Sequence, residues 1–264
     1  MKNCLIITRV KLPGLAFVAL ALFGSSAAWA QSSGNFVSTV DNTVCSINTT
    51  NGALIPPGPC SPSNPLCFTG PGGGSLTTTI KLPSSSPGLL VTPSLDTGMY
   101  TNTGTSGISE TAAIVVVVTD AVSGSPTKTL TPNQTCVDTS STGTTNCTGP
   151  GTPTADCQCG VVYDERFQQM NFFLFGGFSA DKLILSTMSA HSFNFTEGNV
   201  PGGIHTVKMN WYFGCDDGTG FLHTAQCMST FTPDTAAACA GPGTLTVEQV
   251  QNFQHDSQIQ TTGP

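Results

Sequence analysis

Charged residues are scarce in this sequence. They make up 9% of its 264 residues, whereas soluble proteins average roughly 25%. Only eight residues are Lys or Arg against fifteen Asp or Glu, which gives a formal net charge of −7. Proteins that bind nucleic acid or anionic lipid surfaces need a basic surface. We therefore expect no nucleic-acid partner for this acidic chain.

Apolar runs long enough to span a membrane are also lacking. The run Leu12–Phe23 covers about 12 residues, fewer than the roughly 20 that a membrane helix needs. It follows the basic residues Lys2, Arg9 and Lys11 and precedes Ala28-Trp29-Ala30, an order typical of a secretory signal peptide. Residues 1–30 are therefore expected to be a signal peptide, with no transmembrane segment left after its cleavage.

Cleavage before Gln31 would make the chain more acidic. The signal contains three basic and no acidic residues, so the charge of residues 31–264 falls to −10. Because residue 31 is Gln and not Cys, we expect no lipid-modified N-terminus. The short signal is typical of bacterial export, which predicts a periplasmic or extracellular protein.

Signatures of known catalytic sites are missing too. The sequence has no G-x-S-x-G, S-x-x-K or H-E-x-x-H motif, so the common serine hydrolases and zinc proteases have no support. The glycine-rich stretch Gly70–Gly74 lies between cysteine residues with no helical pattern after it, which argues against phosphate binding. Catalytic residues therefore stay unknown, and neither a cofactor nor a metal site is predicted.

Helical periodicity is weak throughout, and only Thr246–Phe253 is a helix candidate. Strand patterns bounded by Gly, Pro and Asn are frequent instead. In His205–Phe213, Val207, Met209, Trp211 and Phe213 alternate with polar residues, as in a strand with one buried face. Ile114–Thr119 is apolar on both faces, as in a central strand. The other strand candidates are Phe36–Val40, Leu76–Leu82, Leu89–Leu95, Val161–Asn171, Phe172–Phe175, Lys182–Ser186, Ser189–Thr196 and Leu245–Val250.

About nine or ten short strands at irregular spacing favour an all-β, antiparallel β-sandwich, jelly-roll-like, over a barrel. One domain over residues 31–264 is expected, and two smaller β domains split near residues 130–160 are the alternative. Seven phenylalanines between Phe167 and Phe195 predict a dense core in the second half. Three segments are expected to be long loops: residues 51–75, 131–159 and 214–243.

Ten cysteines remain after Cys4 leaves with the signal. An even number in an exported chain is first interpreted as disulfides. The spacing of Cys157 and Cys159 does not fit a zinc site. The ten are Cys45, Cys60, Cys67, Cys136, Cys147, Cys157, Cys159, Cys215, Cys227 and Cys239.

The ten cysteines fall into three clusters, with three in residues 45–67, four in 136–159 and three in 215–239. If all are paired, each cluster of three must send at least one bridge to another cluster. Cys157 and Cys159 are predicted to be a hub that reaches both outer clusters, so that the clusters converge on one side of the fold. The predicted local bridges are Cys136–Cys147, Cys60–Cys67 and Cys215–Cys227.

Two groups of polar residues are candidates for a site. Asp164 and Glu165 are adjacent, so in a strand their side chains point to opposite faces, with Arg166 as a local partner. His191 and His205 are predicted on neighbouring strands joined by a turn, where they are more often ordinary surface residues than metal ligands.

The aromatic residues offer little for sugar binding. Trp29 leaves with the signal, so Trp211 is the only mature Trp, and its alternation places it in the core. A sugar-stacking surface would need exposed aromatic rings.

Two functions therefore remain. The first is an exported, non-catalytic envelope, surface or extracellular protein with a binding or structural role, which contacts an unknown protein or glycan surface through its disulfide-bonded loops. The second is a secreted hydrolase with an unrecognised site around Asp164, His191 and His205. Convergence of these carboxylate and histidine residues in a cleft would favour the enzyme.

Overall fold

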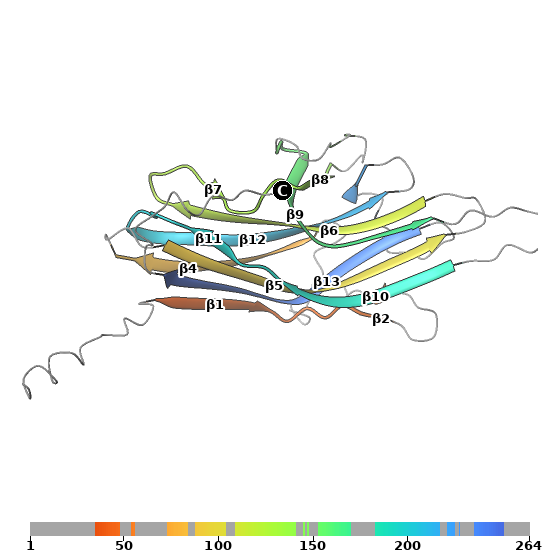
Figure 1. The fold of residues 1–264 in the computed structure, drawn as a ribbon, viewed down its shortest axis with the longest axis horizontal. Helices are drawn as coiled ribbons and strands as arrows, with labels where there is room; N and C mark the ends of the chain where they lie inside the picture. The colour runs from red at the N-terminus through yellow and green to blue at the C-terminus, as the bar shows by residue number, and fades with distance from the viewer. Residues whose placement is uncertain are drawn as a thin grey trace, which may run out of the picture. The chain divides into compact units, whose positions relative to one another are not determined.

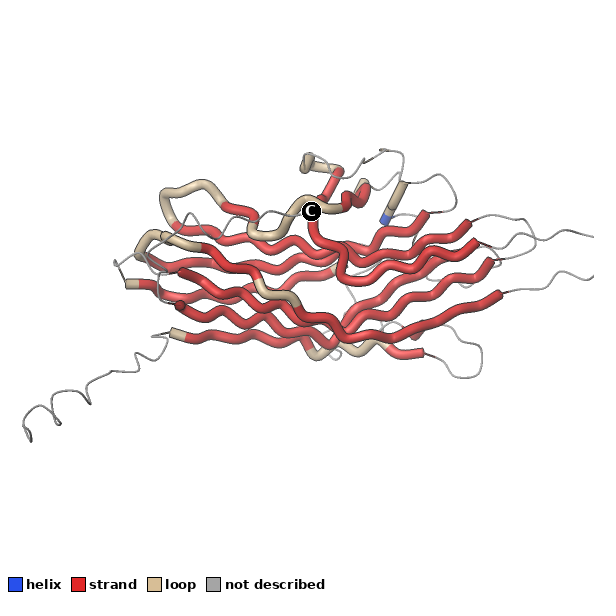
Figure 2. The backbone as a smooth tube through the Cα atoms, viewed as in Figure 1, coloured by secondary structure: helices blue, strands red, loops and turns tan. Residues whose placement is uncertain are grey.

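The computed structural model describes residues 35–47, 54–55, 73–83, 88–103, 109–140, 145, 147, 153–169, 183–216, 221–224, 227 and 235–250. Most of these residues form strands (Figure 2), and all of them lie within one compact unit, Asn35–Pro264. None of them belongs to a helix with the length and apolar character needed to cross a membrane.

Two antiparallel sheets pack against each other, which confirms the predicted all-β sandwich (Figure 1). The first, the β5 sheet, has the order β1–β13–β5–β10, with β11 also paired to β5. Its strands are β1 (Phe36–Asp41), β13 (Thr235–Val250), β5 (Gly88–Thr103), β10 (Leu183–Ser192) and β11 (Phe195–Glu197).

The second, the β6 sheet, has the order β4–β12–β6–β9–β8, with β7 also paired to β6. Its strands are β4 (Gly74–Leu82), β12 (Gly203–Asp216), β6 (Ser109–Val122), β9 (Cys157–Gln169), β8 (Thr135–Asp138) and β7 (Lys128–Thr129). A separate two-stranded pair consists of β2 (Ser46–Ile47) and β3 (Leu54–Ile55).

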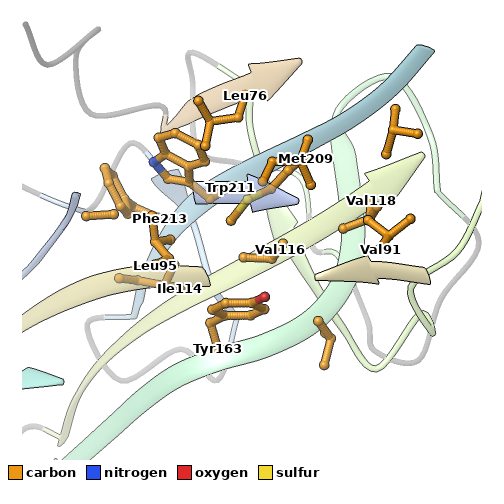
Figure 3. Close-up of a cluster of buried hydrophobic side chains, with 14 of the residues drawn as sticks. Leu76, Val91, Leu95, Ile114, Val116, Val118, Tyr163, Met209, Trp211 and Phe213 are labelled. Atoms are coloured by element: carbon orange, nitrogen blue, oxygen red, sulfur yellow. The ribbon is translucent and has the colours of Figure 1, made fainter. Parts of the chain in front are cut away.

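The alternation in β12 produces the predicted buried face. Val207, Met209, Trp211 and Phe213 are each at most 5% exposed and belong to the core between the sheets (Figure 3). Leu95 of the β5 sheet and Ile114 of β6 belong to the same core. Side chains of a strand alternate between its two faces. The pairing register of β12 therefore places every second residue from Val207 to Phe213 in the core.

Strand β6 is central, as its sequence predicts. It pairs with β12 on one side and with β9 on the other. Ile114 and Val116 face the core, and Ala113 and Val115 on the opposite face are equally inaccessible to solvent. The apolar run therefore reflects burial on both faces, which sheets covered on both sides require.

Several predicted boundaries are wrong. Strand β13 begins at Thr235, inside a predicted loop, and the weak helix candidate after residue 246 is its second half as far as Val250. The run Ala236–Ala240 has low intrinsic strand propensity. Pairing of this run with Thr97–Thr101 of β5 overrides the low propensity, whereas β1 pairs only with residues 243–248 of β13.

Other segments also differ from the prediction. Residues 183–192 form the single strand β10, where two strands had been expected. The short strand β8 lies in the predicted loop 131–159. Phe172–Phe175 lies outside the described residues.

The predicted phenylalanine core is not formed by the residues that can be described. Phe167 is 63% exposed and Phe193 is 37% exposed, and Phe195 is only partly buried against the core. Phe167 points outward because alternation turns its neighbours Arg166 and Gln168 toward the β5 sheet. Valine, leucine and methionine fill the space between the sheets instead.

Replacing Trp211 with Ala should reduce the free energy of unfolding by about 3–5 kcal/mol, the usual cost of truncating a large core aromatic residue. Trp211 is 5% exposed, and its ring packs so closely on Gly74 that a Cβ there would lie 2.2 Å from Cζ2. Urea denaturation followed by circular dichroism measures the change. Phe167→Ala, at a 63% exposed position, is the control and should stay within about 0.5 kcal/mol of the parent. Equal losses in the two variants would contradict the register.

Candidate functional site

The cysteines of residues 136–159 pair within their own cluster. Cys136 pairs with Cys159, and Cys147 pairs with Cys157. The predicted Cys136–Cys147 bridge is therefore wrong, and Cys157 and Cys159 are not a hub to the outer clusters. The reason is the register: β8 pairs with β9 so that Cys136 lies directly opposite Cys159.

The outer clusters are joined directly. Cys45 pairs with Cys239, which satisfies the parity argument, and the local bridge Cys215–Cys227 is confirmed. The predicted Cys60–Cys67 bridge lies outside the described residues. These pairs indicate that the chain belongs in an oxidising environment.

The clusters do not converge on one side. Cys239 lies on the outer face of the β5 sheet, packed with Cys45 and Tyr100. Strand β8 lies instead on the outer side of the β6 sheet (Figure 1). Its Val137 would contact a Cβ placed on Gly214 of β12. The sandwich therefore separates the Cys45–Cys239 bridge from Cys136–Cys159 and Cys147–Cys157, whereas Cys215 and Cys227 belong to the core between the sheets.

Two loop clusters meet at the pair Asp138–His223. Asp138 forms an isolated bridge with His223, which in turn bridges Cys215. The Asp138 carboxylate accepts hydrogen bonds from Ser140 N at 2.8 Å and Thr145 N at 2.9 Å, and its Oδ2 lies 3.1 Å from His223 Nδ1. Asp138 and His223 are 0% and 4% exposed. The buried Asp138 carboxylate thus connects Ser140 and Thr145 to His223, which forms a bridge with Cys215 near the end of β12.

These contacts shift the pKa of Asp138. Burial alone would raise it, but the hydrogen bonds from Ser140, His223 and Thr145 together outweigh burial and lower the pKa below its ordinary value. Hydrogen bonds to a carboxylate favour its charged form. The group is therefore ionised whenever the chain is folded near neutral pH.

Residues 131–140, 153–160 and 221–224 together form a surface, the β8 platform. Three disulfides and the Asp138–His223 pair hold it in place. Its exposed side chains are almost all uncharged, with Asp156 as the one acidic residue among them. They are Pro132, Gln134, Pro153, Thr154, Ala155 and Asp156. This surface offers rigid hydrogen-bonding groups of low charge.

A second polar group lies where β9 faces β5 and β10. Asp164 Oδ2 accepts a hydrogen bond from Thr97 Oγ1 at 2.7 Å and lies 3.7 Å from His191 Nε2. A register shift in β9 between its pairings with Ile114 and Val115 turns both Tyr163 and Asp164 toward the other sheet. Such bulges re-aim side chains. The structure therefore brings two of the three hydrolase candidates together.

The third candidate, His205, is elsewhere. It lies on β12 of the β6 sheet, whereas His191 lies on β10 of the β5 sheet, so the predicted neighbouring strands are wrong. His205 is 0% exposed, with Nδ1 2.6 Å from Asp120 Oδ2 and Nε2 2.8 Å from the Pro201 carbonyl oxygen. Since a carbonyl oxygen only accepts, Nε2–H donates to it. His205 is thus committed to the core.

The carboxylates near Asp164 behave as predicted in one respect. Glu165 points away from Asp164 and is exposed. Arg166, predicted as the local partner of the acidic pair, instead donates from Nη2 to Thr187 Oγ1 at 2.6 Å.

The geometry at Asp164 differs from that of a hydroxyl nucleophile and its base. In such a site the hydroxyl is hydrogen-bonded to the imidazole, which an acid orients. Here the Thr97 hydroxyl contacts Asp164 and the Ser189 carbonyl oxygen, and His191 approaches only the carboxylate. Within the described ranges, no three His, Cys, Asp or Glu residues gather as metal ligands would.

A pocket of about 350 Å³ lies beside Trp211, between the β1 and β4 edges of the two sheets. Asp41 and Asn210 contribute to its wall. Both carboxylate oxygens of Asp41 are already occupied, since the backbone N–H and the hydroxyl of Thr43 donate to them at 3.0 and 2.6 Å. The acid therefore fixes the chain after β1.

Sequence reasoning missed Thr97, Asp138 and His223. Asp138 had one local signal. In turns, an Asp side chain commonly accepts a hydrogen bond from the backbone N–H two residues later, as Asp138 does from Ser140 N. Its partner His223 lies 85 residues away, and no pattern in the sequence connects them. The role of Thr97 is visible only in the structure, because its contact with Asp164 depends on how the β5 sheet packs against β9.

No protein family model matches this chain, and no curated protein sequence is significantly similar to it.

Acid should weaken the β8 platform through Asp138. Because its folded pKa is lowered, the carboxylate stabilises the fold above the unfolded pKa near about 3.9 and this contribution is lost as pH falls below it. The parent should lose more stability between pH 7 and pH 3 than Asp138→Asn, measured by urea denaturation at each pH. Asp138→Asn should itself cost roughly 1–3 kcal/mol at pH 7.

Asp156→Asn, at an exposed platform position, serves as the control. It should keep the parent's loss of stability on acidification. An identical acid response in the Asp138→Asn variant would show that the Asp138 contacts do not stabilise the fold.

Proposed function

We propose that this chain is an exported, non-catalytic β-sandwich protein of an envelope, surface or extracellular location, and that its β8 platform binds an uncharged, hydrogen-bonding surface of a protein or glycan. The observation that carries the proposal is the bonding of the platform. Three disulfides and one buried Asp–His pair hold a surface whose exposed residues carry a single charge and combine the polar Gln134, Thr154 and Asp156 with Pro and Ala.

Rigid loops are suited to binding because little conformational entropy is lost when the partner attaches. Loops held on a stable scaffold are also where contact residues concentrate. The platform has both properties: Cys136–Cys159 joins β8 to β9, and Cys147–Cys157 joins Cys147 to the first residue of β9. Binding would need no rearrangement of the sandwich.

The chemistry of the partner follows from the surface. Gln134 and Thr154 offer amide and hydroxyl groups, with only Asp156 charged among the exposed platform residues. The chain as a whole is acidic, which disfavours anionic partners. Export is supported by the paired cysteines and by the signal-like residues 1–30.

Binding should depend on the platform bridges and not on the opposite face. The mature chain is screened on an array of neutral and charged glycans and on a panel of purified extracellular proteins. We expect a neutral hit whose affinity changes little between low and high salt, because charge contributes little. Cys147→Ser with Cys157→Ser should weaken that hit by at least about tenfold, or about 1.4 kcal/mol.

Cys45→Ser with Cys239→Ser is the matched control, because that bridge lies on the outer face of the other sheet. It should leave affinity unchanged wherever circular dichroism shows an intact sandwich. Equal loss in both double variants, or no loss in the platform variant, would contradict binding by the platform.

A secreted hydrolase stays the second candidate because Asp164 and His191 approach each other at a partly exposed position, with side chains 17% and 32% exposed. Turnover on a panel of ester, peptide and glycoside substrates separates the two functions. The binding proposal expects none. Activity that disappears in both Asp164→Asn and His191→Ala, while the fold persists, would establish the enzyme instead.

A further inference from the structure

A row of polar contacts crosses the sandwich between β9 and the β5 sheet. Successive inward-facing residues of β9 each contact a threonine on the opposite sheet, where apolar side chains would be expected. The three contacts are Asp164 with Thr97, Arg166 with Thr187, and Gln168 with Thr101.

The last of these contacts is the most deeply buried. Thr101 is 0% exposed and Gln168 is 5% exposed, and the Thr101 hydroxyl donates to Gln168 Oε1. The hydroxyl of one sheet therefore lies against the side-chain amide of the other in a site that excludes water. A hydroxyl and an amide carbonyl carbon are a nucleophile and an electrophile of acyl transfer.

A carboxyl group lies beside them. Glu110 of β6 is the Cα partner of Gln168 on β9, and it is 2% exposed. Glu110 stands two residues before Ala112, so it shares the inward face of β6. Directly opposed residues on one face of a sheet have Cβ atoms about 4.5–5.5 Å apart. The Glu110 carboxyl is therefore within reach of the Gln168 amide.

The disulfides do not join the two sheets at this place. Cys136–Cys159 and Cys147–Cys157 belong to the β6 sheet and its outer loop, and Cys215–Cys227 lies at the end of β12. Cys45–Cys239 fastens the segment after β1 to β13 of the β5 sheet. Among the described residues, no disulfide therefore joins a strand of the β5 sheet to a strand of the β6 sheet.

We propose that Thr101 and Gln168 form an intramolecular ester that links the two sheets covalently. Glu110 accepts the proton of the Thr101 hydroxyl as Oγ1 attacks Cδ of Gln168. The Oγ1–Cδ bond forms, the Cδ–Nε2 bond breaks, and the proton passes from Glu110 to the leaving nitrogen. The products are one ester and one molecule of ammonia. No oxidant, cofactor or second substrate is required.

Folding supplies the driving conditions. Fixing two reactants in one geometry raises their effective concentration by up to about 10⁵–10⁸ M in well-oriented cases. Ammonia leaves the site and is diluted and protonated in bulk water, which opposes the reverse reaction. The exclusion of water protects the ester from hydrolysis.

Peptide mapping tests the link directly. Trypsin should release residues 82–128, which contain Thr101 and Glu110, and residues 167–182, which contain Gln168. Neither peptide contains cysteine, so no disulfide can connect them after reduction. From the secreted full-length mature protein, we expect one species whose mass is the sum of both peptides less one ammonia. Fragment ions should place the link at Thr101 and Gln168.

Mapping is preferred to intact mass because an N-terminal Gln31 can also lose ammonia by cyclisation. Hydroxylamine cleaves esters but leaves amides intact, so treatment should separate the pair and leave a hydroxamate on Gln168. A linked pair that resists hydroxylamine would overturn the assignment as an ester.

Two variants and one control complete the test. Thr101→Val removes the hydroxyl with little change in volume and should give only separate peptides. Glu110→Gln keeps both reacting groups and should form the link slowly or not at all. Thr97→Val removes the equivalent hydroxyl contact to Asp164 and should leave the link intact.

Separate peptides in the folded parent protein would overturn the proposal. A Glu110→Gln variant that links as completely as the parent would overturn the role of Glu110 as the base.

Discussion

The structure depends on one constraint, the burial of strand β6 on both of its faces. Its inner face packs against the β5 sheet, and its outer face, with Ala113 and Val115 at 0% exposure, needs a second cover. β8 lies on that side, with Val137 against the position of Gly214. A strand of four residues buries too little apolar area to hold itself in place, and small apolar layers commonly need disulfides. The two disulfides to β9 therefore stabilise this cover over the outer face of β6, whether or not a partner binds.

The core between the sheets changes character along β9. Before the register shift, Val161 and Tyr163 belong to the apolar cluster; after it, Asp164, Arg166 and Gln168 face the β5 sheet with polar partners. Buried polar groups are tolerable only where each finds a hydrogen-bond partner. The threonines of β5 and β10 supply one hydrogen-bond partner each to Asp164, Arg166 and Gln168, which favours the inward packing of this polar strand. The approach of His191 to Asp164 is one consequence of this packing and does not by itself require chemistry.

The accuracy of each sequence-based prediction depends on how local its signal is. The alternation in His205–Phe213 and the apolar run near Ile114 depend only on neighbours in the chain, and both strands form as expected. The alanine run of β13 was missed because its strand state comes from pairing with β5, which is distant in sequence. The disulfide map was wrong where register decides it, since Cys159 and not Cys147 lies opposite Cys136. The Asp138–His223 pair and the contacts of Thr97 and Thr101 have the same origin. These contacts depend on how the strands align, which the amino-acid composition does not determine.

Because the chain has few charged residues, disulfides and buried hydrogen bonds hold its loops in place. Few ion pairs are available: among the described residues, Lys128–Glu197 is the one contact between a lysine or arginine and a carboxylate, and Lys128 is largely exposed, so such a pair contributes little. Surface ion pairs therefore cannot hold the loops. Cysteine bridges hold the outer face of each sheet, and Asp138 and His205 anchor segments from inside through hydrogen bonds. A scaffold fixed in this way leaves an exposed loop surface of low charge. Part of that surface also supports the fold, because Thr154 and Gln134 accept hydrogen bonds from the backbone N–H groups of Cys157 and Val162.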